Sequence, residues 1–301
     1  MIALAPGKIV VSGAYAVLEG APAIVVAVDR YATADTTRSP AFVTPEVAAA
    51  IGEKPAPWFD ASPLRDGDRK LGLGSSAAIL VASLAALELE ARGALDDSTL
   101  CGLVLERALR AHRSAQGGGT GIDVAAACHG GTIVAERRRG MLAVTRSALP
   151  DALHLEVWAA GHPASTPALL EQVERLSQRT PERYRQLLEA QSAAARAGAL
   201  ALERGSAPAL VASLRDQCRC LDELGEASEA AIVTAGVRTL NEAAQREGAA
   251  VLPSGAGGGD VALFAGLAPP SQKLRAMANH HGHLPLALRL EARGVHHVDG
   301  D

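Results

Sequence analysis

The chain has 301 residues, of which 48% are hydrophobic but only 3% aromatic, and its formal net charge at pH 7 is −4. This length allows two domains, the composition is typical of a globular protein, and the core must consist mainly of Ala, Leu and Val. The negative charge removes the long-range attraction to polyanions that nucleic-acid binding requires, and no uncharged apolar segment reaches the 18 residues of a membrane span.

The first part of the chain predicts a sheet followed by helices. Apolar runs at residues 9–11 and 23–28, flanked by Gly and Pro, predict strands. The proline-rich segment 38–70 is expected to be irregular or weakly paired. A strongly apolar helix is predicted over residues 76–92, and a second over residues 98–115 with Ser98 as its N-cap.

After a glycine run at residues 117–121, a buried helix that includes residues 124–128 is predicted to end at Gly130. Residues 132–135 and 142–145 predict a hairpin, and residues 153–159 open a new sheet. We therefore place a domain boundary near residue 150, with one domain over 1–150 and a second over 151–301.

The second domain is predicted to be mainly helical. Residues 167–247 have the pattern of three or four amphipathic helices, with breaks at 180–181, at 205–208 and near Gly225. The remaining pattern predicts a strand at 261–264, a helix at 272–279 and a strand at 286–290. The expected fold class is α+β in two halves.

Several other features have structural interpretations. The N-terminal residues lack the basic region and apolar run of a secretory signal, and the four cysteines are too few for a disulfide framework, which indicates a reducing cytoplasm. His296 and His297 are expected to be solvated, and the run at 136–140 to form a charged hairpin turn. Zinc ligation is disfavoured for the Cys-x-Cys pair and the histidines near residue 281 because their spacing is not that of a zinc site. These residues are Cys218, Cys220, His280, His281 and His283.

The strongest functional signal is the segment KLGLGSSAA at residues 70–78, which leads directly into the predicted helix. Glycines there let backbone N–H groups turn inward, and the positive end of the helix adds to a nest for phosphate oxygens. The alternative is a serine N-cap behind a flexible loop. A dinucleotide-binding fingerprint is disfavoured because no buried strand precedes the glycines, and a Walker A loop because Ile9 follows Gly7-Lys8.

Two further glycine clusters occur. The segment QGGGTGIDV at residues 116–124 ends in Asp123 at the start of an apolar helix, where an acid alone is commonly a cap. The segment PSGAGGGDV at residues 253–261 precedes a predicted strand. Four glycines exceed what a hairpin loop requires, so close approach of the backbone to a ligand is the better explanation.

Three segments, in this order, resemble the motifs of the galactokinase, homoserine kinase, mevalonate kinase and phosphomevalonate kinase (GHMP) superfamily. They are APGKIVVSG at residues 5–13, GLGSSAA at 72–78 and SGAGGGD at 254–260. The resemblance extends over almost the whole chain. It implies an N-terminal domain like ribosomal protein S5 domain 2, a ferredoxin-like C-terminal domain and ATP in the second motif.

Within the superfamily, the chain is most similar to the phosphomevalonate kinase branch. That similarity rests on His112 followed by AQG and GTGIDVA, on ASTP at residues 164–167, and on the form of the third motif. Departures are the short chain, the abbreviated 40–70 region and Thr120 in place of Ser. The resemblance implies phosphorylation of phosphomevalonate to diphosphomevalonate in the mevalonate route to isoprenoids. Mevalonate kinase, a decarboxylase of the superfamily and a non-catalytic ligand-binding regulator are the alternatives.

The resemblance also implies roles for individual residues. Asp123 would orient or deprotonate the acceptor oxygen, and Lys8 would stabilise a phosphate and keep Asp123 ionised. Ser76 is the expected Mg²⁺ ligand. His112 stands where mevalonate kinases carry Glu, which would leave Mg²⁺ with one protein carboxylate fewer. The expected ATP-binding residues are Gly72, Leu73, Gly74, Ser75, Ser76 and Ala77. The expected substrate-binding residues are Lys8, Tyr15, Arg113, Ser114, Gly119, Thr120, Ser165, Thr166, Gly255, Ala256 and Gly257.

The third motif is expected to close over the site, with Asp260 fixing this loop or touching ligand. Because aromatic residues are scarce, the adenine is expected to be held by aliphatic contacts. The expected partners are ATP and a small phosphorylated substrate, with neither nucleic acid nor membrane. The sequence leaves the oligomeric state open, and a homodimer is compatible with it.

Overall fold

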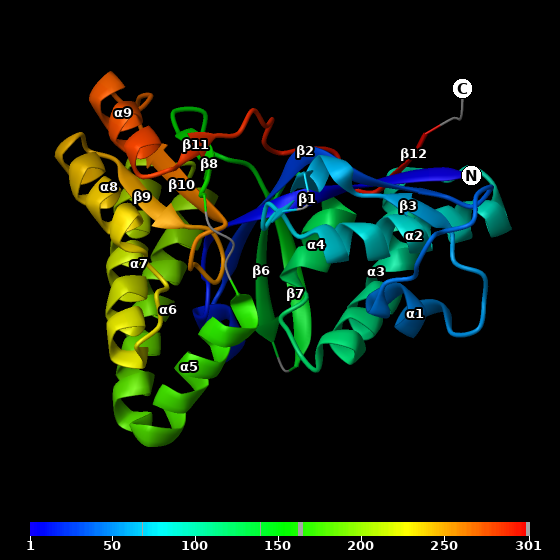
Figure 1. Ribbon diagram of the computed structural model, residues 1–301, viewed down its shortest axis with the longest axis horizontal. Coiled ribbons are helices and arrows are strands. Elements are labelled where there is room, and N and C mark those ends of the chain that lie inside the picture. The colour runs from blue at the N-terminus through cyan, green and yellow to red at the C-terminus, as the bar shows by residue number, and fades with distance from the viewer. Residues whose placement is uncertain (68, 139, 162–164, 299–301) are drawn as a thin grey trace.

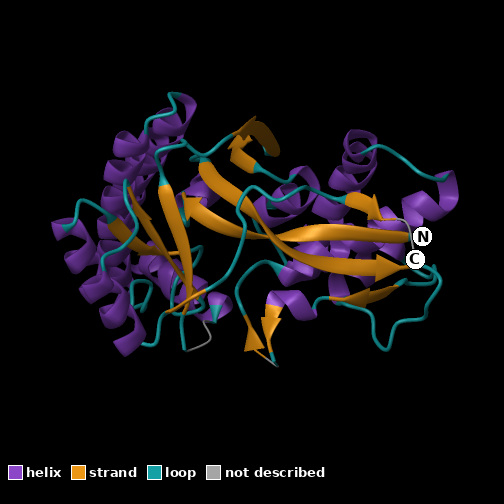
Figure 2. Cartoon of the chain, turned by 90° about the horizontal axis from the view of Figure 1, so that it is seen from above, coloured by secondary structure: helices purple, strands orange, loops and turns teal. Residues whose placement is uncertain are grey.

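The computed structural model describes residues 1–67, 69–138, 140–161 and 165–298, and its elements form two large sheets with helices packed on them and one two-stranded ribbon (Figure 1). The larger sheet has six strands in the order β12-β1-β2-β6-β7, with β3 also paired to β2, and every pairing is antiparallel. Its strands are β1 (Ile2–Ser12), β2 (Ala23–Asp35), β3 (Trp58–Asp60), β6 (Thr132–Arg138), β7 (Met141–Ser147) and β12 (His296–Val298). Figure 2 shows the long strands β1 and β2 running side by side across the molecule.

The helix α2 (Ser75–Arg92) is the centre of the first half. Its residues 77–86 are all buried because the helix packs on β1 and β2 and also against α3 and α4. This explains why the segment is apolar on every side instead of amphipathic. The other helices of this half are α1 (Pro45–Ile51), α3 (Asp97–Gln116), α4 (Ile122–His129) and the short 3₁₀ helices η1 (Ala16–Glu19) and η2 (Ser62–Leu64).

The second half has a four-stranded antiparallel sheet in the order β11-β8-β10-β9. Trp158 and Phe264 stack on this sheet with ring centroids 5.8 Å apart. The strands are β8 (His154–Ala159), β9 (Ala250–Pro253), β10 (Val261–Gly266) and β11 (Leu284–Pro285). The helices are α5 (Thr166–Arg179), α6 (Pro181–Glu203), α7 (Ala207–Ser228), α8 (Ala235–Arg246) and α9 (Gln272–His280).

The C-terminal segment returns to the first half of the chain. β12 pairs with the start of β1, and isolated bridges join Val28 to Leu290 and Gly130 to Arg293. Helix α6 also packs on β2 and η1. A domain boundary near residue 150 stays a prediction. The pairing of β12 with β1 shows that the C-terminal segment joins the sheet of the first half.

The predicted helices over 76–92, 98–115 and 124–128 and the hairpin at 132–145 are confirmed, but two details of the first half were wrong. The segment 38–70 is not irregular throughout, because Thr44 caps α1, Pro45 occupies its first turn and Ile51 is buried. A two-stranded ribbon, β4 (Arg65–Asp66) with β5 (Arg69–Lys70), follows. The N-cap of α3 is Asp96 instead of Ser98, since its carboxylate accepts the N–H groups of residues 98 and 99.

Three further expectations were wrong for the second half. Gly225 lies inside α7, which ends at Ser228, so the break comes later than expected. Residues 286–290 form no strand beyond the single bridge at Leu290. His296 is not solvated but 8% exposed, with its Nδ1 2.7 Å from the Gly294 carbonyl oxygen. Arg139, in the charged turn, and Ala164, in the ASTP segment, lie outside the described residues. In the parts of the chain that the structure describes, none of the helices combines the length and apolarity needed to cross a bilayer.

Candidate active site

The loop before α2 presents the start of that helix as an anion site. Gly72 and Gly74 have φ angles of +70° and +77°, in the left-handed region that favours glycine. The Ala78 N–H donates to the Gly74 carbonyl at 3.1 Å, which is the first hydrogen bond of the helix. The N–H groups of residues 75–77 precede this bond and therefore have no partner within the helix. These amides and the positive end of the helix together favour phosphate oxygens.

Strand β1 holds this loop in place. The backbone N–H of Lys8 donates to the Leu73 carbonyl at 2.8 Å, and its Nζ lies 3.5 Å from the Gly72 carbonyl. A Cβ atom at Gly7 would lie 2.8 Å from that same Leu73 oxygen, so only glycine allows the approach. Leu73 and Ala77 are buried, and they anchor the loop from within.

A lysine and a carboxylate meet beside the loop. Lys8 Nζ lies 3.5 Å from Asp123 Oδ2, with 10% of the lysine side chain and 32% of the carboxylate side chain exposed. Asp123 lies in the first turn of α4, which begins after Gly121 (φ +78°) and packs on β1 and α2. The sequence-predicted interaction of these two residues is therefore present in the structure, and its acid remains open to a ligand.

The glycine-rich loop at residues 254–259 belongs to the second half but contacts the first. The Tyr15 hydroxyl donates to the Ala256 carbonyl at 2.7 Å, and Ser254 Oγ accepts the Val10 N–H at 2.9 Å. Burial raises the pKa of the Tyr15 phenol far above its ordinary value, so this hydroxyl remains a donor at neutral pH. A Cβ atom at Gly72 would lie 2.7 Å from Asp260 Cβ, so the two glycine loops approach each other closely.

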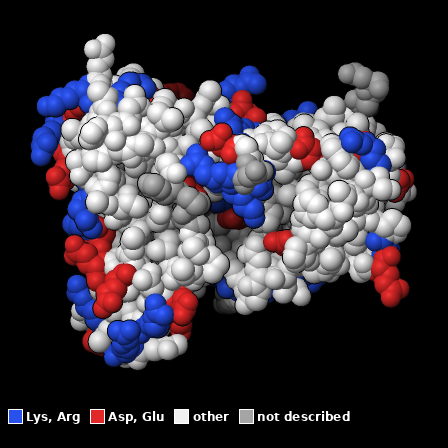
Figure 3. Space-filling model, viewed as in Figure 1, with Lys and Arg blue, Asp and Glu red and all other residues white. Residues whose placement is uncertain are grey.

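Between these loops lies a cleft of ≈ 760 Å³. Figure 3 shows Lys and Arg side chains gathered beside the hollow in the middle of this face. Three cationic and two acidic side chains line the cleft, which suits an anionic ligand. The lining residues are Lys8, Arg69, Lys70, Gly72, Gly74, Ser75, Ser76, Asp123, Thr166, Pro167, Ser254, Gly255, Ala256, Gly257 and Asp260.

Ten of the sequence-predicted site residues therefore converge on one cleft. They are Lys8, Gly72, Gly74, Ser75, Ser76, Asp123, Thr166, Gly255, Ala256 and Gly257. Leu73, Ala77 and Tyr15 are buried and are not among the residues that line the cleft. Arg113, Ser114, Gly119, Thr120 and Ser165 are not among the lining residues, and their role in binding stays a prediction. His112 is buried, with its ring 3.8 Å from where a Cβ of Gly119 would lie.

Arg69 and Lys70 were missed by sequence reasoning. Arg69 donates from β5 to the carbonyl of Ala160, just after β8, so it connects the two halves beside the cleft. The available signal was two consecutive cations directly before the Gly-x-Gly-Ser-Ser motif.

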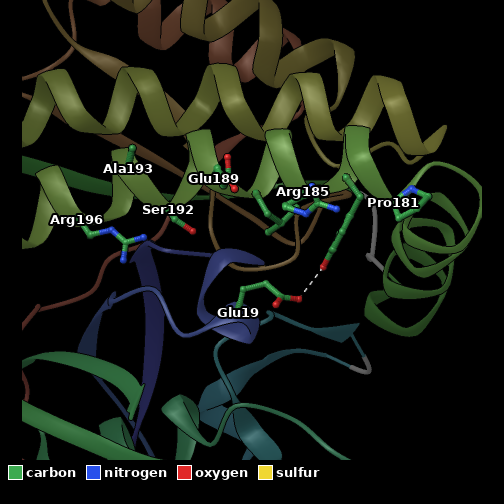
Figure 4. Close-up of a pocket in the computed structure, with 9 residues that line it drawn as sticks. Glu19, Pro181, Arg185, Glu189, Ser192, Ala193 and Arg196 are labelled. Atoms are coloured by element: carbon green, nitrogen blue, oxygen red, sulfur yellow. Dashed lines mark hydrogen bonds between the residues drawn. The ribbon is translucent and has the colours of Figure 1, made fainter. Parts of the chain in front are cut away.

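A second cleft, of ≈ 600 Å³, lies between η1 and α6 (Figure 4). The Tyr184 hydroxyl donates to Glu19 Oε1 at 3.0 Å across it. Its lining residues include Arg185, Glu189 and Arg196 but no glycine. The cleft at the glycine loops is therefore the better candidate for an active site.

Gly257 and Gly255 provide a matched test of the glycine-rich loop. Both have positive φ, but a Cβ at Gly257 would lie 2.2 Å from the Ile232 carbonyl oxygen, whereas one at Gly255 would meet nothing within 4 Å. We expect Gly257→Ala to lower the free energy of unfolding by about 3 kcal/mol or more, and Gly255→Ala by about 1 kcal/mol. Urea unfolding measures both changes in the free energy of unfolding, and an unchanged m-value shows that the variants unfold by the same transition as the wild type. Equal losses would show that backbone crowding at Gly257 has no effect.

Comparison with known proteins gives matches over the whole chain. Residues 60–131 match the model of the GHMP kinases N terminal domain. The chain is 29% identical to a phosphomevalonate kinase from Streptomyces sp. (strain CL190), with 97% of both chains covered. It is 29% identical to a mevalonate kinase from Archaeoglobus fulgidus, over 46% of this chain and 54% of the relative.

Solved structures share the fold. A Lin0012 protein from Listeria innocua superposes with a TM-score of 0.83 at 23% identity, with both chains covered completely. The Streptococcus pneumoniae phosphomevalonate kinase in complex with phosphomevalonate and AMPPNP gives a TM-score of 0.76 at 19% identity, with 96% of this chain and 99% of that chain covered. These likenesses confirm the expected α+β architecture.

Proposed function

We propose that this chain is a GHMP kinase, in keeping with the match of residues 60–131 to the N-terminal domain of that family, and that it transfers the γ-phosphoryl group of ATP to phosphomevalonate, giving diphosphomevalonate. The observation that carries the proposal is the Lys8–Asp123 pair, which borders the same cleft as the start of α2. In phosphoryl transfer the protein must hold the phosphates, neutralise their charge and align the acceptor. The start of α2, Lys8 and Asp123 are suited to these three tasks, in that order. The full-length similarity to the Streptomyces phosphomevalonate kinase supports this choice of acceptor.

The start of α2 would hold the triphosphate, with the amides of residues 75–77 directed at its oxygens. Mg²⁺ prefers oxygen ligands, and the cleft offers the Ser76 hydroxyl and the carboxylates of Asp123 and Asp260. Among the described residues, no three His, Cys, Asp or Glu side chains are arranged to hold a metal ion. We infer that Mg²⁺ would be held by Ser76, by the nucleotide phosphates and by water.

Asp123 would orient the acceptor oxygen and take its proton, and Lys8 would neutralise charge on the transferring group. Phosphomevalonate carries a phosphate and a carboxylate, so its binding needs further cations. Arg69 and Lys70 are suitably placed in the lining, and Thr166 adds a hydroxyl from α5. We assign the protein to the cytoplasm, in keeping with the four cysteines that the structure leaves as thiols.

Mevalonate kinase is the second candidate function because the Archaeoglobus mevalonate kinase matches part of the chain. The cationic pair Arg69 and Lys70 favours the phosphorylated acceptor, since mevalonate offers only one negative charge to neutralise. Coupled ADP release from ATP with mevalonate, phosphomevalonate and diphosphomevalonate decides between them. Turnover with phosphomevalonate is the expected result. Turnover with mevalonate alone would overturn our choice, and turnover with none would favour a non-catalytic binder.

Gly74→Ala is expected to raise the KM for ATP by about ten-fold or more. The residue has φ +77°, and a Cβ there would lie 2.9 Å from Lys8 Cε, so both the loop and the lysine must shift. Gly117→Ala is the matched control, since its φ is +66° but nothing lies within 4 Å of the added carbon. Steady-state kinetics with varied ATP measure the effect. Equal changes in the two variants would mean that the approach of Gly74 to Lys8 does not matter.

A further inference from the structure

A cleft of ≈ 560 Å³, distinct from the candidate active site, lies where α3, α4 and the C-terminal segment meet. It is lined by two cysteines from different helices, Cys101 on α3 and Cys128 on α4, and by the adjacent His129. The Cys101 and Cys128 thiols interact with each other, and each shifts the pKa of the other. The same sulfur lies 3.6 Å from His129 Nδ1.

The surroundings favour a thiolate on Cys101. The Cys128 hydrogen bond, followed by His129 and the Arg146 guanidinium, lowers the pKa of the Cys101 thiol. Arg146 also donates to the His129 carbonyl at 3.0 Å. Burial raises the pKa of Cys128 well above its ordinary value, so that this thiol stays a protonated donor.

The acidic groups around this cleft are engaged elsewhere. Asp97 pairs with Arg293, with Oδ2 2.6 Å from Nε. Glu291 Oε1 accepts the Thr132 hydroxyl at 2.7 Å and the Leu149 N–H at 3.0 Å. Their partners reduce the negative charge that would oppose a thiolate, and His129 and Arg146 remain the groups that act on Cys101.

All four cysteines are buried, but Cys218 and Cys220 differ from Cys101 in the direction in which their pKa is shifted. Cys218 and Cys220 are two residues apart on α7, where side chains at i and i+2 do not face each other. Burial raises the pKa of both thiols. They serve as internal controls for the reactivity of Cys101.

We propose that Cys101 is a site of oxidation by hydroperoxides and that Cys128 resolves the product into a disulfide between α3 and α4. In the first step the Cys101 thiolate attacks one hydroperoxide oxygen, so an S–O bond forms, the O–O bond breaks and the alcohol or water leaves with the proton released by Cys101. In the second step the Cys128 sulfur attacks the sulfenic sulfur. The S–S bond forms, and the hydroxyl group leaves as water with the Cys128 proton. Two thiols and one hydroperoxide thus give one disulfide, one alcohol or water, and one water.

Treatment of the full chain with hydrogen peroxide, followed by alkylation of the remaining thiols and peptide mapping without reduction, tests the proposal. We expect a cross-linked peptide pair that contains residues 101 and 128, with Cys101 consumed about ten-fold faster than Cys218 or Cys220. Reduction should restore both thiols. Equal consumption of all four cysteines, or no cross-link while Cys101 is oxidised, would overturn the proposal.

Variants separate the two steps. Cys128→Ser should stop at the sulfenic acid of Cys101, which a dimedone-type probe labels, whereas Cys101→Ala should leave Cys128 unoxidised. Cys218→Ala is the matched control and should behave as the wild type. Circular dichroism verifies that each variant folds. The peptide map of the peroxide-treated wild type tests the disulfide without any variant. Labelling of Cys128 in the Cys101→Ala variant at the wild-type rate would contradict the assigned order.

Discussion

Asp123→Asn is expected to lower kcat by roughly 10²- to 10⁴-fold, which is the usual contribution of a positioned general base. The amide keeps the shape of the side chain but cannot take a proton, and it loses the charge that Lys8 faces at 3.5 Å. Because the triphosphate would be held by the start of α2, the KM for ATP should change little. ADP release with ATP and phosphomevalonate varied separately measures both parameters.

The control for this variant is Asp216→Asn on α7, whose carboxylate is exposed and lies outside the cleft. It should have the kinetics of the wild type. Asp123→Asn with a kcat within about three-fold of the wild type would remove Asp123 from the chemical step. A large rise in the KM for ATP with unchanged kcat would instead place it in nucleotide binding.

Lys8→Met is expected to lower kcat/KM by roughly 10²- to 10³-fold, comparable with the loss of one preorganised donor to a transition state. Methionine retains an apolar stem of similar shape against Gly74, where the lysine methylenes pack closely. The substitution therefore removes the charge with little change in packing. Titration of ATP against the variant, together with kinetics, separates lost binding from lost turnover.

Lys273→Met, at an exposed position on α9, is the control for general effects of removing one positive charge. It should leave kcat/KM unchanged. Lys8→Arg tests whether the position needs a lysine or only a cation, and the narrow space beside Gly74 predicts that arginine does not restore activity. Full activity of Lys8→Met would show that phosphate charge is neutralised elsewhere.

The elements that could be predicted from sequence are those with a strong local signal. Helix α2 was recognisable because residues 77–86 are apolar except for Ser83, and α4 because glycines flank a short apolar run. The convergence of Lys8, Gly74 and Asp123 came from motif resemblance. Nothing in their spacing brings a residue of β1 to the start of α2, and the contact depends on the packing of Gly7 under Leu73.

Features that depend on distant partners could not be predicted. The bond from Tyr15 to Ala256 joins positions 241 residues apart, and neither sequence position has a pattern that indicates the other. Arg69 lines the cleft because a two-residue strand aims it at the second half, and so short a strand leaves no periodicity. His296 is buried only because the C-terminal segment pairs with β1.

That returning segment also affects synthesis of the protein. The outer partner of β1 is β12, so the start of β1 is made about 290 residues before the strand that pairs with it. Until residues 296–298 leave the ribosome, the edge of β1 at residues 2–4 lacks this strand and exposes unpaired backbone groups. A nascent chain therefore carries a pairing edge through most of translation, where a chaperone or a second nascent chain can add a strand.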